Sequence, residues 1–193
     1  SGVAAAAAIA RRKSARVTLI GRDGFGPGLA YATKDKSHLL NVRAANMSAY
    51  ADKPHDFADW LKSKTGAEGA IFATRGAFGA YTEDVLKRAQ RTAMFGAGLK
   101  RVRGDAVACH AGSGWWHVEL DSGKSIEANA IVLALGNQPI LQPGIFADAG
   151  IAVLNPWDAA ELRRIGKGDV LLLGAGLTMI DAALSLAERP RTQ

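Results

Sequence analysis

Two glycines, Gly174 and Gly176, stand where an apolar run over residues 169–174 gives way to a segment of helical composition. The first glycine of such a turn permits a sharp bend, and the second lets the backbone approach a pyrophosphate closely. The helix that follows would add free N–H groups and positive potential. Met179 occupies the third glycine position of G-x-G-x-x-G, so the match is partial. The pattern indicates a dinucleotide-binding turn, with an ordinary strand-to-helix turn as the alternative.

The first residues have the pattern expected for the later part of a similar dinucleotide-binding unit. Ser1-Gly2 precede an alanine-rich segment, residues 3–13, and a β-branched run over 16–20. This order predicts the tail of a glycine loop, a crossover helix and the second strand of a βαβ unit. An acid at the end of such a strand binds ribose, but Gly21 stands there, and Asp23 is the nearest substitute. Because the first strand would precede Ser1, we expect the chain to be part of a longer protein.

Two other kinds of chemistry are disfavoured. Cys109 and His110 are adjacent in a strand-like stretch, so their side chains should point to opposite faces and cannot form a nucleophile–base pair. His38, His55 and His117 show no metal-ligand spacing among themselves or with the cysteine. We therefore predict neither cysteine catalysis nor a metal site.

The helices that must position these residues follow from apolar spacing. Phe57, Trp60 and Leu61 fall at i, i+3 and i+4 in a helix that Asp52 and Pro54 are expected to open and Gly66 to end. All three are predicted to be core residues. Thr82 is the expected N-cap of the next helix, because acids follow it and then an apolar stripe. The basic residues of that helix are expected to face water: Lys87, Arg88 and Arg91.

Strand signals dominate the second half. Short β-rich runs between residues 99 and 135 predict an antiparallel meander that ends in a buried strand over 131–135, with one of Trp115 and Trp116 buried. A short helix is expected near 157–165. Another buried strand, 169–174, should then lead through the glycine turn into a helix from about Leu177 to Arg189, stopped by Pro190.

Composition narrows the class of protein. The chain has 193 residues, 48% hydrophobic and 22% charged, which is typical of a globular domain. One cysteine cannot form an internal disulfide, which favours a cytoplasmic location. No apolar run approaches the roughly 20 residues that span a bilayer, so no membrane partner is predicted. The net charge of +6 comes from scattered clusters, so we predict no nucleic-acid partner, although a basic nucleic-acid-binding module remains an alternative.

Several segments together resemble the bacterial FAD/NAD(P)-binding oxidoreductases that have two dinucleotide-binding domains. These segments are 28–33, 38–42, Ala44, 47–49, Phe57, Trp60, Arg75, Phe78-Gly79, Tyr81, 131–136, 155–158 and 173–181. The resemblance implies an α/β fold. A Rossmann-like FAD-binding domain with an antiparallel β-meander would cover 1–142, and the connection to an NAD(P)-binding Rossmann domain and its start would cover 143–193. The layout is similar to that of flavin-containing and N-hydroxylating monooxygenases.

The resemblance also implies roles for individual residues. Ser1 and Gly2 would close the FAD pyrophosphate loop, Leu135 and Gly136 would lie near the FAD, and Gly174, Gly176 and Thr178 would meet the nicotinamide nucleotide. The 38–48 segment would line the flavin and substrate space. Its cofactor-binding candidates are His38, Asn41, Met47 and Ser48, with Asp23 added for the ribose, and its catalytic candidates are Asn41, Asn46 and Ser48. Loop capping is the alternative role of His38 and Asn41.

The resulting hypothesis is a flavin-dependent oxidoreductase. NAD(P)H would reduce FAD, and the reduced flavin would pass electrons to oxygen, as in a monooxygenase, or to another acceptor, as in a reductase. The expected partner is a small-molecule substrate. A non-catalytic nucleotide-binding or sensor protein on the same fold is the first alternative, suggested by Gly21 and Met179.

Overall fold

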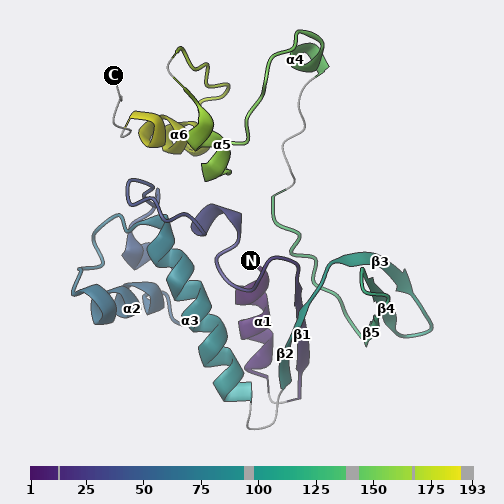
Figure 1. Ribbon diagram of the computed structural model, residues 1–193. Helices are drawn as coiled ribbons and strands as arrows, with labels where there is room; N and C mark the ends of the chain where they lie inside the picture. Colours follow the sequence, from purple (N-terminus) through teal and green to yellow (C-terminus); the bar gives the residue numbers. More distant parts are fainter. Residues whose placement is uncertain (13, 94–97, 138–143, 167, 188–193) are drawn as a thin grey trace.

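The computed structural model describes residues 1–12, 14–93, 98–137, 144–166 and 168–187 (Figure 1). The first half contains α1 (Gly2–Ala10), β1 (Arg16–Gly21), the short 3-10 helices η1 (Leu29–Tyr31) and η2 (Ala44–Asn46), α2 (Asp56–Thr65) and α3 (Arg75–Ala93). Four strands follow: β2 (Gly98–Arg103), β3 (Ala106–Ala111), β4 (Trp116–Leu120) and β5 (Ser125–Ala128). The last helices are α4 (Gly144–Asp148), α5 (Ala159–Arg164) and α6 (Leu177–Ala187).

The N-terminal half is built around a parallel pair of strands, β1 and β2. The strands pair in register from Arg16 opposite Gly98 to Gly21 opposite Arg103, and α1 contacts both β1 and α3. The expectation that the run around Val102 belongs to the meander is wrong. The long crossover through α2 and α3 returns β2 alongside β1, and such crossovers produce parallel pairing. The fold is therefore mixed α/β, with this parallel pair separate from the meander.

The predicted meander is confirmed for β3, β4 and β5, which pair antiparallel in that order. Val118 and Leu120 of β4 are buried. Trp115 and Trp116 are 47% and 39% exposed, so the prediction that one of them is buried is wrong. Trp116 shares a face with Val118 and Leu120 but is the first residue of β4, at the end of the covered surface.

Helix α3 starts well before the predicted N-cap. Arg75 is its first residue, and the hydroxyl of Thr82 donates to the carbonyl of Gly79 inside the helix, so Thr82 is not an N-cap. Gly76 and Gly79 obscured this start, because glycines weaken a helical pattern. A Cβ on Gly76 would lie 2.8 Å from the carbonyl oxygen of Thr33. These glycines are present because the 31–33 backbone runs close against the helix.

The core lies between α1, α2 and α3. Its largest fully buried side chains are Phe57, Tyr81, Leu86 and Val85. Phe57 is central to an aromatic cluster, with its ring centroid 5.0 Å from that of Phe78 and 5.1 Å from that of Tyr81. The prediction that Phe57 and Leu61 are core residues is confirmed, whereas Trp60, predicted with them, is only partly buried against the core. Helix α2 ends as predicted at Gly66, whose φ of 73° is the left-handed conformation that favours glycine.

Two predicted strands are absent. Residues 131–135 and 169–174 form no strand, and Leu133 and Leu171 are 73% and 80% exposed. An extended apolar run becomes a strand only where another strand pairs with it, and within the described residues neither run has such a partner. The helices predicted around these runs are confirmed as α5 and α6. Arg189 and Pro190, the predicted end of α6, lie outside the described residues.

Candidate cofactor and substrate site

The start of α1 meets the segment that follows the meander. Ser1 precedes the first helical residue, and its carbonyl accepts from the N–H of Ala5 at 3.0 Å. The first amides of a helix have no acceptor within it, so this end of α1 offers donors to an anion. A Cβ on Gly2 would lie 3.3 Å from the Cβ of Ala134. The structure therefore brings Ser1-Gly2 beside the segment that continues into Leu135-Gly136.

The end of β1 explains why no acid follows the strand directly. A Cβ on Gly21 would lie 2.5 Å from the carbonyl oxygen of Gly24 and 3.2 Å from the ring of Phe25. The turn folds back over the strand end, so only glycine fits there. The carboxylate of Asp23 is 89% exposed and 3.4 Å from Nε of Arg22. Its role toward a ribose stays a prediction.

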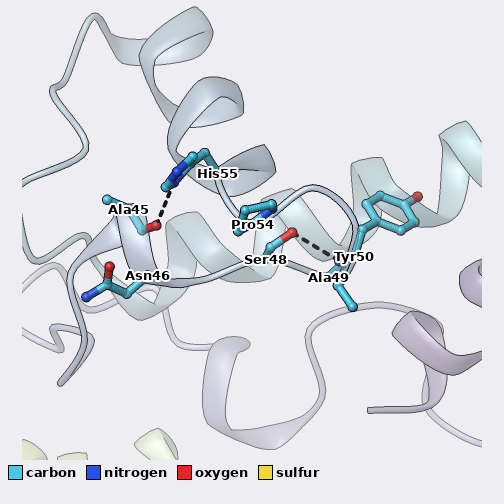
Figure 2. Close-up of a pocket in the computed structure, with 8 residues that line it drawn as sticks. Ala45, Asn46, Ser48, Ala49, Tyr50, Pro54 and His55 are labelled. Atoms are coloured by element: carbon cyan, nitrogen blue, oxygen red, sulfur yellow. Dashed lines mark hydrogen bonds between the residues drawn. The ribbon is translucent and has the colours of Figure 1, made fainter.

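A hollow of about 430 Å³ opens on the loop between η2 and α2 (Figure 2). Among its lining residues are two predicted ones, Asn46 and Ser48, and one that the prediction missed, His55. The hydroxyl of Ser48 donates to the carbonyl of Lys53 at 2.6 Å and accepts from the N–H of Tyr50 at 3.0 Å. Ser48 therefore shapes the loop, while Asn46 is exposed at the rim.

His55 offers the hollow a defined ring nitrogen. Its Nδ1 lies 3.0 Å from the carbonyl oxygen of Ala45. A carbonyl only accepts, so Nδ1 carries the proton and Nε2 of the neutral ring is left as an acceptor. Sequence spacing gave no signal for this role, because the contact depends on the turn between η2 and α2.

A charged network fixes the wall of the hollow to the core. The carboxylate of Asp56 accepts from the hydroxyl of Tyr81 at 2.7 Å and from both terminal nitrogens of Arg88, at 3.0 and 2.8 Å. The Tyr81 oxygen accepts in turn from the N–H of Ala49 at 3.0 Å. Arg88 also lies 3.0 Å from Asp84. The prediction that Arg88 faces water is therefore wrong: it is half-buried, because Asp56 holds it inward.

The ionisation of this network follows from its contacts. Burial disfavours the charged form of Asp56, but the hydrogen bonds from Arg88 and Tyr81 outweigh it and hold the pKa of this carboxyl below its ordinary value. Burial also raises the pKa of the Tyr81 phenol. Asp56 is thus charged and Tyr81 neutral at physiological pH.

The remaining predicted residues of the 38–48 segment do not converge on the hollow. The ring of His38 lies against α6, with Nε2 2.8 Å from Oγ of Ser185. Asn41 is exposed, and Met47 packs against the hydrophobic core. The structure therefore brings Asn46 and Ser48 together and places His38, Asn41 and Met47 elsewhere. None of these contacts tests cofactor binding, so their proposed roles stay predictions.

The second glycine turn leads directly into α6 as predicted. Gly174 has a φ of 120°, outside the range of ordinary side chains, and the space around a Cβ on Gly176 is open to 4 Å. Thr178 lies in the first turn of α6, and its role toward a phosphate stays a prediction. The turn is therefore open at Gly176, and nucleotide binding there stays a prediction.

A buried ion pair beside this helix was not predicted from the sequence. Arg75 and Asp181 lie 2.9 Å apart, with side chains only 11% and 12% exposed. Asp181 is the only charged residue between Leu177 and Ala187. A lone acid in an apolar helix is the signal that could have indicated a buried partner.

These features define a dinucleotide-binding α/β protein: a glycine-led helix on a parallel strand pair, with a meander returning the chain to the helix start. Residues 1–138 match the model of the FAD-NAD(P)-binding family, and the chain belongs to that family. No curated protein matches the chain. Within the described ranges, no helix is long and apolar enough to cross a membrane.

Proposed function

We propose that the protein is a flavin-linked oxidoreductase in which NAD(P)H reduces FAD and the electrons pass to oxygen or to a small-molecule acceptor. The observation that supports this best is the family match over residues 1–138. Gly2 and Ala134, which approach each other in the structure, both lie within that range. That approach places the first amides of α1 beside the segment predicted to meet the flavin.

The residues at the start of α1 fit the phosphates of FAD. Gly2 leaves room for the passing segment at Ala134, and the first turn of α1 presents N–H donors to negative charge. Gly136, with a φ of 74°, turns the chain just after Leu135. Bound FAD supplies the redox chemistry, while these residues hold and orient it.

The turn at Gly174 and Gly176 is the proposed site for the nicotinamide nucleotide. Its open backbone and the N-terminus of α6 favour a pyrophosphate. The hollow beside η2 is the proposed substrate space. Asn46 and Nε2 of His55 would hydrogen-bond a small polar molecule there.

The test is FAD content in the purified full-length protein. We expect stoichiometric FAD in the wild type and its loss in Gly2→Val, because a β-branched side chain would push against Ala134. Gly98→Val is the matched control, since a Cβ on Gly98 meets only the Arg16 side chain, at 3.9 Å. A folded wild-type protein that cannot be reconstituted with FAD would contradict the proposal. Oxygen uptake after reduction would then separate oxygenase from reductase activity.

A further inference from the structure

Two separate segments form a small frame at the start of α3. The N–H of Arg75 donates to the carbonyl of His38 at 2.8 Å, and the N–H of Leu40 donates to the carbonyl of Ala73 at 2.9 Å. This pairing sets the side chains of His38 and Arg75 next to each other. In Figure 1, α6 lies beyond this N-terminal end of α3.

Asp181 of α6 is held by this frame at two points. Its carboxylate lies 2.9 Å from Nη2 of Arg75, and its main-chain carbonyl lies 3.1 Å from Nε2 of His38. The carbonyl can only accept, so Nε2 of His38 carries a proton. Nδ1 lies 3.1 Å from the hydroxyl of Thr33, which can donate to it. Both ring nitrogens of His38 therefore have a hydrogen-bond partner.

The next turn of α6 adds a third point. Ser185 Oγ lies 2.8 Å from Nε2 of His38 and donates to the carboxylate of Asp35 at 2.9 Å. Hydrogen bonds from Ser37 and then Ser185 keep the pKa of Asp35 low despite partial burial. This is not a nucleophilic triad, because the acid accepts from the serine and a threonine faces Nδ1. The contacts hold a helix in place.

We propose that Asp35, His38 and Arg75 form a clasp that, through Asp181 and Ser185, positions α6 and its glycine turn for NAD(P)H. The proposal rests on the function proposed above. Arg75 and Asp181 are positioning residues in it, since they act on the nucleotide through the helix.

The clasp is needed because the segment that leads into the glycine turn, residues 169–174, is not anchored to any of the described strands. Leu171 and Leu173 are 80% and 63% exposed, and residues 169–174 pair with no strand among those described. From Gly176 to Asp181 the helix rises about 7.5 Å, at about 1.5 Å per residue, so a fixed Asp181 fixes the turn. The same frame begins the 38–48 segment, so the clasp links α6 to the start of the segment predicted to line the flavin.

The test combines two measurements on the full-length FAD-loaded protein carrying Asp181→Asn or Arg75→Met. Hydrogen exchange of the amides in α6 should become at least about tenfold faster. The KM for NAD(P)H should rise between about tenfold and a hundredfold, while FAD content stays unchanged. Glu68→Gln is the matched control, because it removes the exposed Lys62–Glu68 pair, at 3.2 Å, near the end of α2. Ser185→Ala gives a milder version if the first variants fold poorly.

The outcomes separate the clasp from the proposed function. If hydrogen exchange in α6 is as slow in both Asp181→Asn and Ser185→Ala as in the Glu68→Gln control, the clasp is refuted, whatever the KM for NAD(P)H. Faster exchange with an unchanged KM overturns its role in positioning the nucleotide. A wild-type protein that binds FAD but is not reduced by either nucleotide refutes the proposed function and the nucleotide-positioning claim together, while exchange in α6 still decides whether the clasp itself exists.

Discussion

Replacing Asp56 by asparagine tests whether the half-buried network holds the wall of the hollow. In the Asp56→Asn variant the new amide would keep an oxygen for Tyr81 but lose the charge that binds Arg88 at 3.0 and 2.8 Å. Hydrogen bonds to charged groups contribute about 1.5–3 kcal/mol each. The 34% exposure of Arg88 and its second partner, Asp84, reduce that value. We expect a loss of about 2 kcal/mol, or a Tm lowered by about 4–8 °C.

The assay is thermal and urea unfolding of wild type and variant, followed by circular dichroism. Asp52→Asn is the matched control, because Asp52 forms a shorter bidentate pair with Arg11, 2.6 Å for both bonds, whose side chains are 55% and 42% exposed. Solvent should make that shorter pair the weaker one. A Tm shift in Asp56→Asn no larger than that in Asp52→Asn would refute the reasoning.

The stability difference between wild type and Asp56→Asn should also depend on pH. Because the pKa of folded Asp56 is depressed, its stabilisation is complete above the unfolded pKa of about 3.9 and disappears as the pH falls through the folded value. The stability difference between wild type and Asp56→Asn should therefore shrink from about pH 5 toward pH 3. A difference that stays constant across that range would contradict the assigned ionisation.

Three further changes have defined outcomes. Gly79→Ala should destabilise the protein by about 1–3 kcal/mol in urea unfolding, because its Cβ would meet the backbone carbonyl of Tyr31, although alanine normally favours a helix. A stabilised variant would show that the loop can move away. Asp158→Ala should lower the free energy of unfolding by about 1 kcal/mol, because the carboxylate caps α5 through the amides of Ala160 and Glu161. Faster hydrogen exchange confined to α5 would locate the loss. Gly2→Ala should weaken FAD binding less than Gly2→Val in a flavin titration, and equal effects would contradict the steric account.

Most of the helices could be predicted from the sequence because they depend on residues that are close together in the chain. The apolar spacing of α2, its end at Gly66 and the start of α6 after Gly176 depend on neighbouring residues, and the structure confirms them. The start of α3 could not be found in this way. Gly76 and Gly79 are accepted inside the helix only because a distant loop packs on them, which is a tertiary effect.

Strands were predicted less well because pairing is not local. The hairpins of the meander are joined by short turns and were predictable, whereas β2 pairs with β1, a strand far earlier in the chain. The apolar runs at 131–135 and 169–174 have strand composition without a strand partner among the described residues. Side-chain partnerships were the least predictable, as the ion pair between Arg75 and Asp181 shows, since its members lie far apart in the chain.

The central claim is that NAD(P)H reduces a flavin held by this chain. The most direct measurement is an anaerobic absorption titration of the FAD-loaded full-length protein with NADPH and, separately, with NADH. The account predicts that one of them bleaches the visible flavin bands with one equivalent per FAD, and that oxygen or an electron acceptor restores them. A flavin spectrum that neither nucleotide changes, in protein that still responds to dithionite, would contradict it.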